Sequence, residues 1–144
     1  MDHVTALCLY VVTSWAVAPP SAVALKTCED VGAAALVEGL SPVLVIALAF
    51  TESRFNPEAR SPRDAVGPLQ VIAWFHCPKK RERGCDVVDA GVKSIKRCRT
   101  RFGSGWLCHW NSGNTCYRRS RLFARIVLKR ASELSQARGE LCRM

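Results

Sequence analysis

Glu52 is the residue whose surroundings best fit acid chemistry. It closely follows the apolar run Val43–Phe50 and precedes the dipeptide Asn56-Pro57, which places its carboxyl group where a helix meets a loop. A carboxyl group flanked by hydrocarbon resists ionisation, because desolvation disfavours its charged form. Such a glutamate can stay protonated near neutral pH and act as a general acid. The alternative is an ordinary surface glutamate near a helix end.

The residues after Glu52 form an extended pattern. They read Glu-Ser-Arg-Phe-Asn-Pro from Glu52 to Pro57, followed by Ser61 and then by Gly-Pro-Leu-Gln from Gly67 to Gln70. This pattern resembles the signature of the soluble lytic transglycosylases, relatives of goose-type lysozymes that cut the glycan strand of peptidoglycan. In that family the glutamate is the single catalytic acid. It is followed by a serine, an aromatic residue, Asn-Pro, a later serine and Gly-Leu-Met-Gln.

Three further segments resemble the same family. Leu107 to Gly113 stands where the family usually reads Ala-x-Ala-Tyr-Asn-Ala-Gly, Phe123 to Val127 matches its C-terminal helix, and Gly39 to Leu44 matches the lead-in to its catalytic helix. The resemblance covers roughly residues 28 to 130. It implies a mainly α, lysozyme-like single domain.

The resemblance also implies a site that needs no metal and no organic cofactor. Glu52 would protonate the oxygen leaving C1 of N-acetylmuramic acid (MurNAc) and then accept the proton of the same sugar's C6 hydroxyl, which gives a 1,6-anhydro end. Ser61 and Gln70 match positions that line the cleft. The alternative for Ser61 is an ordinary loop hydroxyl, and the alternative for Gln70 is an amide that bonds only to the backbone. Trp110 is the aromatic residue expected to contact sugar, and Asn111 is expected to brace its turn and reach the site.

Some positions depart from the family pattern. Asp64 stands where the family prefers glycine, and Trp110 and Phe123 replace tyrosines, which removes two phenolic hydroxyls. If Asp64 faced Glu52 across the cleft, a second carboxylate would allow hydrolysis by an activated water. The alternative for Asp64 is a solvated turn residue.

Residues 1–24 have the composition of an export signal. Asp2 is their only formally charged residue, the apolar stretch Val4–Ala18 is too short for a comfortable membrane span, and Ala22-Val23-Ala24 gives a small-x-small cleavage pattern. Cleavage after Ala24 would leave residues 25–144 as the lysozyme-like domain, exported to the periplasm or cell envelope. The alternative is an uncleaved segment that tethers the protein to a membrane.

Eight cysteines are many for a chain of 144 residues, and in an exported protein they indicate disulfides that reinforce a small domain. Cys8 would leave with the signal, so an odd number would remain and one thiol would stay free or pair between chains. Short closures are possible for two pairs, Cys77 with Cys85 and Cys108 with Cys116. A longer closure would join Cys98 to Cys28 or Cys142.

The spacing of these cysteines does not fit zinc, because no two of them lie two to four residues apart. No metal is therefore expected.

The chain carries a formal net charge of +9, and loss of residues 1–24, with their single acidic charge, would make it +10. Such a protein is attracted to polyanions, and the glycan strands of peptidoglycan with their attached polymers are polyanionic. Nucleic acid is not an expected partner, because the sequence shows no nucleic-acid-binding motif. A secretion or conjugation apparatus, or the entry or lysis machinery of a bacteriophage, would each be a possible setting.

Helix signals dominate along the chain. A capping pattern at Thr27 predicts a helix over residues 28–38, and Ser41-Pro42 predicts the start of the helix that carries Glu52. A short helix or an extended segment is expected over 69–75. Helices are further predicted over 86–102, 106–110 and 118–137.

Three functions remain open from the sequence: a lytic transglycosylase, a hydrolytic muramidase with the same substrate, and a non-catalytic cationic wall-binding protein that kept the fold.

Overall fold

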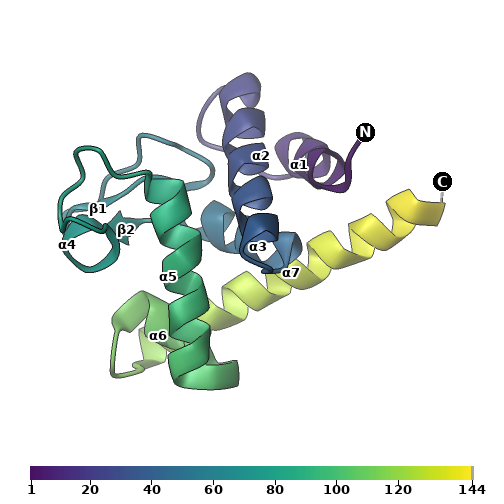
Figure 1. Ribbon diagram of the computed structural model, residues 1–144. Helices are drawn as coiled ribbons and strands as arrows, with labels where there is room; N and C mark the ends of the chain where they lie inside the picture. The colour runs from purple at the N-terminus through teal and green to yellow at the C-terminus, as the bar shows by residue number, and fades with distance from the viewer. Residues whose placement is uncertain (144) are drawn as a thin grey trace.

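The computed structural model describes residues 1–143, with side chains through residue 139. The described chain is mainly helical, as predicted, with an antiparallel pair of two-residue strands. Helices α2 and α7 pack on α3, and α1, α5 and α6 pack around these three (Figure 1). The elements in chain order are α1 (His3–Ser14), α2 (Ser21–Val37), α3 (Pro42–Ser53), β1 (Ala65–Val66), β2 (Val71–Ile72), α4 (Ala73–His76), α5 (Val87–Phe102), the 3₁₀ turn η1 (Gly103–Gly105), α6 (Trp106–Ser112) and α7 (Arg118–Arg143).

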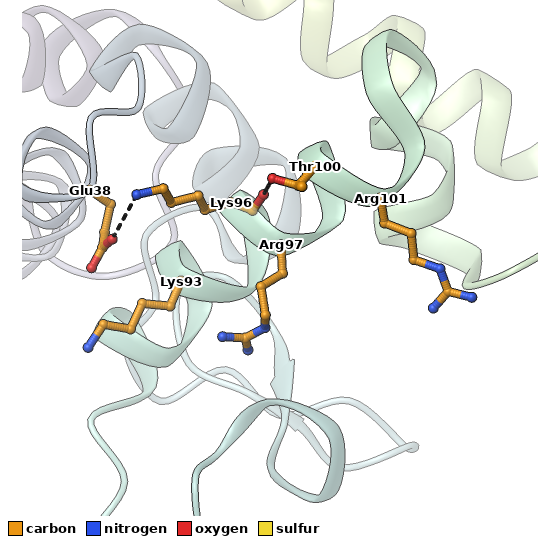
Figure 2. A pocket seen from close by; sticks show the side chains of 6 residues that line it. All are labelled: Glu38, Lys93, Lys96, Arg97, Thr100 and Arg101. Atoms are coloured by element: carbon orange, nitrogen blue, oxygen red, sulfur yellow. Dashed lines mark hydrogen bonds and ion pairs between the residues drawn. The ribbon is translucent and has the colours of Figure 1, made fainter.

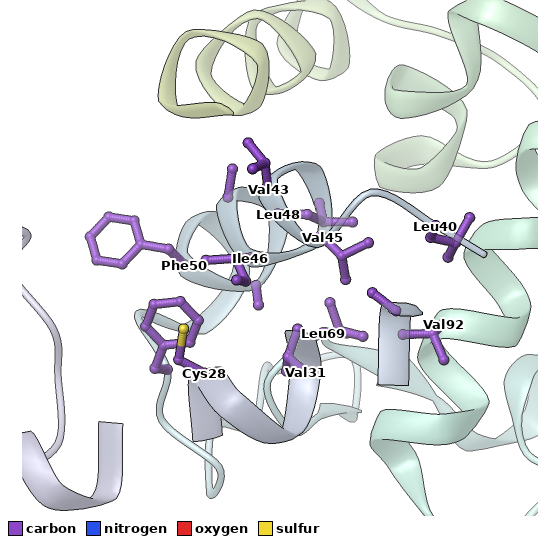
Figure 3. Close-up of a cluster of buried hydrophobic side chains, with 14 of the residues drawn as sticks. Cys28, Val31, Leu40, Val43, Val45, Ile46, Leu48, Phe50, Leu69 and Val92 are labelled. Atoms are coloured by element: carbon purple, nitrogen blue, oxygen red, sulfur yellow. The ribbon is translucent and has the colours of Figure 1, made fainter. Parts of the chain in front are cut away.

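The central helix α3 begins where the sequence predicts. Ser41 is its N-cap and accepts a hydrogen bond from the backbone N–H of Leu44 at 3.4 Å, and Pro42 occupies the first turn. The run from Val45 to Phe50 is buried on all sides (Figure 3). A helix that is apolar all round belongs inside a domain, so α3 is a rigid support for the residues at its end.

Helix α2 begins earlier than predicted. It starts at Ser21, and the Thr27 hydroxyl donates to the carbonyl of Val23 at 2.8 Å, so Thr27 lies inside the helix instead of capping it. The predicted end is correct, since the helix stops at Val37 and Gly39 adopts a positive φ of 71°. The capping pattern at Thr27 was misleading because a threonine within a helix can bond to the carbonyl four residues back.

The segment between α3 and α5 combines the two forms that the sequence left open. β2 is extended and α4 is a single helical turn, and the Cys77–Cys85 disulfide closes the loop that follows. α5 packs tightly against this segment at Gly91, where a Cβ atom would lie only 2.7 Å from a methyl group of Leu69. Gly91 therefore lets α5 approach the loop that carries Gln70.

The N-terminal helix α1 is part of the hydrophobic core. Asp2 caps it by accepting a hydrogen bond from the backbone N–H of Thr5 at 2.8 Å. Leu7 and Val11 are buried with the other core residues, and a disulfide joins Cys8 of α1 to Cys28 of α2.

The cysteine pairing agrees with the sequence analysis in two of three cases. The short closures Cys77–Cys85 and Cys108–Cys116 are both present. The proposed pairing of Cys98 with Cys28 or Cys142 is wrong, because Cys28 bonds Cys8 and the Cys98 thiol is free. Assigning Cys8 to a cleaved signal removes the true partner of Cys28. The Cys142 side chain lies outside the described residues.

Cleavage of residues 1–24 stays a prediction. In the folded protein the cleavage point lies inside α2, and Ala24 is fully buried, so a peptidase could cut there only before the chain folds. Such a cut would also leave Cys28 without its partner. Along the part of the chain that the structure describes, no helix combines the length and apolar character needed to cross a membrane.

A chain that starts at Leu25 is expected to be at least about 5 kcal/mol less stable than the full chain in urea denaturation. It lacks the buried side chains of Val4, Leu7 and Val11, at about 1.5–3 kcal/mol each, and a disulfide that contributes about 2–4 kcal/mol. The matched control, Cys8→Ser with Cys28→Ser, removes the bond alone and should lose less. Equal stability of the truncated and full chains would show that residues 1–24 are dispensable, as a cleaved signal is.

Candidate active site

Glu52 lies in the last turn of α3, one residue before the helix ends at Ser53. The chain then turns sharply, since Arg54 and Phe55 both have positive φ, at 51° and 63°. Left-handed conformations are unfavourable for such side chains, and they persist where the surroundings hold them. The Phe55 side chain is fully buried, which anchors the turn.

The environment of Glu52 keeps its carboxyl group protonated. Burial raises the pKa of Glu52 from its ordinary value of 4.5 to about 8, because desolvation disfavours the carboxylate. The C-terminal end of a helix acts in the same direction, since its partial negative charge repels an anion. The Trp110 indole N–H lies within reach of the carboxyl group and opposes the rise in pKa, because it can donate to the carboxylate. The acid predicted from the sequence therefore has the electrostatic surroundings of a general acid.

Residues from both ends of the chain hold the turn that carries Glu52. The Phe50 ring packs against the Trp15 ring, with centroids 4.9 Å apart, and the Arg130 guanidinium lies 4.8 Å from the Phe50 ring centroid. Arg130 of α7 also donates to the Thr51 hydroxyl at 3.0 Å. We call Trp15, Phe50, Thr51 and Arg130 the α3 clamp.

Two further hydrogen bonds hold the end of α3. Ala18 N–H donates to the carbonyl of Arg54 at 3.0 Å, so the segment after α1 contacts the turn directly. The Ser53 hydroxyl donates to the carbonyl of Pro68 at 2.8 Å, in the Gly-Pro-Leu-Gln loop. The residue after the acid thus connects two parts of the motif that are separated in sequence.

Ser61 and Gln70 both stabilise the loop between α3 and β2. The Ser61 hydroxyl accepts from the backbone N–H groups of Arg63 and Ala65, at 3.2 and 3.1 Å. The Gln70 amide donates to the carbonyls of Ala59 and Gly67, at 3.1 and 2.9 Å. Both side chains therefore have the structural role that the sequence analysis gave as an alternative, and their contact with substrate stays a prediction. The Ser61 hydroxyl proton and the Gln70 carbonyl oxygen take no part in these four bonds.

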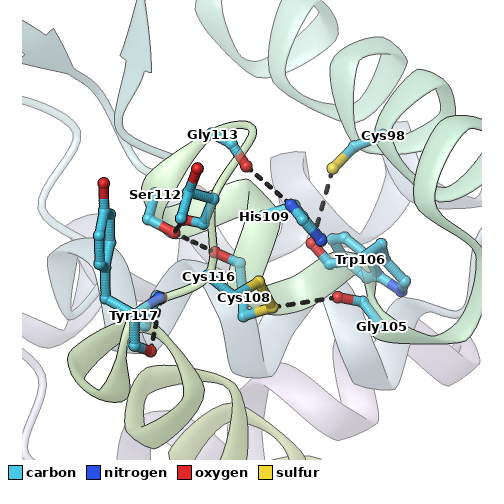
Figure 4. The surroundings of a disulfide bond; sticks show 11 residues. Cys98, Gly105, Trp106, Cys108, His109, Ser112, Gly113, Cys116 and Tyr117 are labelled. Atoms are coloured by element: carbon cyan, nitrogen blue, oxygen red, sulfur yellow. Dashed lines mark hydrogen bonds between the residues drawn. A yellow bond between two sulfur atoms is a disulfide. The ribbon is translucent and has the colours of Figure 1, made fainter.

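Trp110 is next to Glu52, as its effect on the pKa of that carboxyl group shows, whereas Asn111 is exposed on α6. The bracing expected of Asn111 comes from its neighbours. The Ser112 hydroxyl bonds the carbonyls of Cys108 and Thr115, and His109 Nδ1 lies 2.8 Å from the carbonyl of Gly113 (Figure 4). Substrate contact by Trp110 and Asn111 stays a prediction.

His76 is a site neighbour that the sequence analysis missed. Its ring centroid lies 5.5 Å from that of Trp110, which joins α4 to α6. Its Nδ1 atom lies 2.9 Å from the N–H of Ile72, and burial, followed by the field of Arg97, lowers the pKa of His76. The imidazole is therefore neutral near pH 7 and accepts from Ile72. In the sequence, only its place next to Cys77 marks His76, and no spacing pattern connects it to Trp110.

Asp64 is not placed as a second catalytic carboxylate. Its side chain is 84% exposed and pairs with Arg60 at 3.5 Å. Arg60 Nη2 also donates to both carboxylate oxygens of Glu82, at 2.9 and 2.8 Å. Asp64 is therefore the solvated turn residue that the sequence analysis gave as the alternative.

The ligand atoms of Cys108, His109 and Cys116 lie within 4.8 Å of one another. Both sulfur atoms form the Cys108–Cys116 disulfide, so neither can ligate a metal as a thiolate while that bond is intact (Figure 4).

Replacing Glu52 by glutamine is expected to stabilise the protein progressively as the pH rises from 4.5 to 8. In this window the unfolded state releases the Glu52 proton and the folded state keeps it, so the wild type loses stability as the pH increases. Glu52→Gln cannot ionise, and its advantage should reach a few kcal/mol near pH 8. Urea denaturation at pH 4.5, 6 and 8 measures this. A pH-independent difference would show that Glu52 has an ordinary pKa.

Loss of the α3 clamp is expected to loosen the turn after Glu52. Arg130→Gln removes the bond to Thr51 and the cation over Phe50, so exchange of the Arg54 amide, which bonds Phe50, should accelerate by roughly tenfold. Hydrogen exchange followed by NMR measures it. Lys129→Gln is the control, because it removes the same charge from an exposed neighbouring position. Equal acceleration in both variants would assign the effect to net charge.

Comparison with known proteins identifies the family. The family model for the transglycosylase SLT domain matches residues 30–121 of this chain. These residues include α3, Glu52, the Gly-Pro-Leu-Gln loop and α6. A comparison with the curated proteins gave no match, and neither did a comparison with the solved structures. The matched segment covers more than half of the chain and contains Glu52 together with Ser53, Gln70 and Trp110. The chain therefore belongs to the transglycosylase SLT family, whose members are lysozyme-like lytic transglycosylases acting on peptidoglycan.

Proposed function

We propose that this enzyme cleaves the β-1,4 bond between MurNAc and N-acetylglucosamine (GlcNAc) with Glu52 as its single acid and base. The observation that carries the proposal is the place of Glu52 in the last turn of the buried helix α3, beside Trp110, where desolvation raises the pKa of its carboxyl group to about 8. A general acid must be protonated when the substrate binds, and a pKa near the working pH makes proton transfer in both directions efficient.

The reaction proceeds in two proton transfers. The neutral Glu52 carboxyl group donates its proton to the glycosidic oxygen, the bond from that oxygen to C1 of MurNAc breaks, and GlcNAc leaves as an alcohol. The Glu52 carboxylate then accepts the proton of the MurNAc C6 hydroxyl while that oxygen bonds to C1. A 1,6-anhydro ring forms, Glu52 is protonated again, and no water is consumed.

Trp110 supports the second half of this sequence. Its indole N–H favours the carboxylate form of Glu52, which exists only between the two transfers. The Trp110 ring also offers a flat apolar face for a sugar, and Ser61, Gln70 and Asn111 are the polar residues proposed to bind the glycan. For Ser61 and Gln70 the proposed contacts use the hydroxyl proton and the amide oxygen that remain after their loop bonds.

Hydrolysis by a muramidase mechanism has less support. It needs a second carboxylate to activate water, and the candidate, Asp64, is exposed and paired with Arg60. A non-catalytic wall-binding role would leave the desolvation of Glu52 unexplained, since binding through the net charge of +9 does not require a desolvated acid.

The family and the three disulfides indicate that the protein acts outside the cytoplasm. We propose export to the periplasm or cell envelope, with peptidoglycan glycan strands as the partner. Two settings would require an enzyme that opens the wall locally. One is a secretion or conjugation apparatus, and the other is the entry or lysis machinery of a bacteriophage.

Digestion of purified peptidoglycan followed by mass spectrometry tests the proposal. The expected products end in 1,6-anhydro-MurNAc, one water lighter than hydrolysed ends. Glu52→Gln should reduce the rate by roughly 100- to 10,000-fold, because it removes general acid catalysis. Asp64→Asn serves as the carboxyl control and should keep the rate. Reducing ends of full mass, or an unchanged rate in Glu52→Gln, would contradict the proposal.

The pH profile of the same reaction gives an independent reading. In the proposed reaction Glu52 is protonated at the start and again at the end. The rate should therefore fall as the pH rises through about 8, and no second ionisation should lower it on the acidic side. A bell-shaped profile that Asp64→Asn makes one-sided would instead indicate a two-carboxylate mechanism.

A further inference from the structure

Two large aromatic side chains of helix α4 are exposed beside the candidate site. Trp74 is 62% exposed and Phe75 is 72% exposed. The next residue, His76, contacts the ring of Trp110, so α4 adjoins the site. Exposed apolar side chains that lie together among polar residues mark surfaces that bind another molecule. No step of the proposed reaction uses either ring, so the aromatic pair indicates a second binding surface.

The loop that follows α4 is held in place by two bonds. The Cys77–Cys85 disulfide closes it, and Arg60 donates to Glu82 within it at 2.8 Å. The ion pair with Arg60 also compensates the charge of Glu82, which is the only acidic residue between the two cysteines. Residues 78–84 are therefore fixed next to α4.

The cations of this loop are exposed and have no acidic partner. Four of them form no ion pair with any residue that the structure describes: Lys79, Lys80, Arg81 and Arg83. The Lys80 ammonium lies 4.7 Å from the centroid of the Trp74 ring, so the basic loop adjoins the aromatic pair. We call the aromatic pair and these four cations the α4 tip.

A basic surface on helix α5 lacks this combination. Lys96 pairs with Glu38 at 3.8 Å (Figure 2), and Lys93 pairs with Asp89 at 2.9 Å. No large apolar side chain of α5 is exposed. Of these two surfaces, the α4 tip is therefore the one that joins unpaired cations to exposed aromatic rings.

We propose that the α4 tip binds reversibly to the surface of an anionic lipid membrane, with Trp74 and Phe75 among the headgroups and the loop cations against lipid phosphates. Aromatic side chains favour the membrane–water interface, and lysines and arginines beside them are attracted to anionic lipid. The inference goes beyond the proposed function, because no step of glycan cleavage needs a membrane. Since His76 joins α4 to Trp110, binding by the α4 tip would keep the site around Glu52 close to the membrane.

A glycan strand fits the α4 tip less well than a membrane does. Trp74 and Phe75 are consecutive residues of one helical turn, so their side chains point about 100° apart around its axis and offer no common flat face to neighbouring sugars. Lys80 also covers one face of the Trp74 ring. A membrane interface has no fixed shape and accepts both rings, and its phosphates match the four cations.

Cosedimentation with lipid vesicles tests the proposal. The protein should bind vesicles made of equal amounts of phosphatidylglycerol and phosphatidylcholine, and should not bind vesicles of phosphatidylcholine alone. Trp74→Ser with Phe75→Ser should weaken the binding by at least about tenfold, because two apolar side chains no longer insert. Lys79→Gln with Arg81→Gln should weaken it by about fivefold for each charge removed. Binding should also fall at about 1 M salt, where the Debye length is only about 3 Å.

Matched variants at other exposed positions are the controls. Leu122→Ser with Ile126→Ser removes two apolar side chains from α7, and Arg99→Gln with Arg101→Gln removes two charges from α5. Both control variants should bind vesicles nearly as the unaltered protein does. Losses in the controls as large as those in the α4 tip variants would overturn the inference, because they would show that net charge or another face binds the lipid.

Fluorescence locates the contact. Of the four tryptophans Trp74 alone is exposed, so its emission should move to shorter wavelength when anionic vesicles are added, and Trp74→Phe should abolish the change. If the Trp74, Phe75 double variant kept its vesicle binding but lost binding to insoluble peptidoglycan, the α4 tip would be a glycan site and the inference would be wrong. Glu52→Gln should bind vesicles normally, so failure of the proposed function would not affect this test.

Discussion

Desolvation of the Glu52 carboxyl group is the constraint on which the rest of the site depends. It raises the pKa of Glu52 to about 8 and requires apolar surroundings at the end of α3. A carboxyl group at such a place costs stability whenever it ionises, so the surrounding structure must hold it there against the tendency to reach water. The buried run from Val45 to Phe50 provides that hold, because α3 cannot shift without exposing it.

The strained turn after Glu52 is kept in place by segments from the whole domain. Arg54 and Phe55 keep left-handed conformations that are unfavourable in isolation. The compensation comes from distant segments: the α3 clamp fixes the last turn of the helix from both ends of the chain, and Ser53 bonds the loop carrying Gln70. Gln70, itself at a φ of 53°, then stabilises that loop through its amide. Motif residues that look like substrate ligands are therefore also structural links between strained segments.

What the sequence could predict was determined by local signals. The N-cap at Ser41, the apolar run of α3 and the helical period of α5 are local, and each element lies where they indicate. The α3 clamp and the contact of His76 with Trp110 join residues far apart in the chain, and no pattern of spacing reveals such pairs. The pairing of Cys8 was missed for a different reason, since composition had assigned residues 1–24 to a separate segment, whereas α1 packs in the core.

The neutral surroundings of Glu52 also explain how one carboxyl group could serve as both acid and base. A nearby fixed cation would stabilise the carboxylate and lower the pKa, which would weaken the acid form needed for the first step. A nearby fixed anion would make the carboxylate too costly to form between the two transfers. In the proposed reaction, desolvation opposed only by the Trp110 N–H would avoid both problems, because the positive charge developing on C1 of the sugar would be the main partner of the carboxylate. That charge would disappear as the C6 oxygen bonds to C1, and desolvation would then return the proton to Glu52.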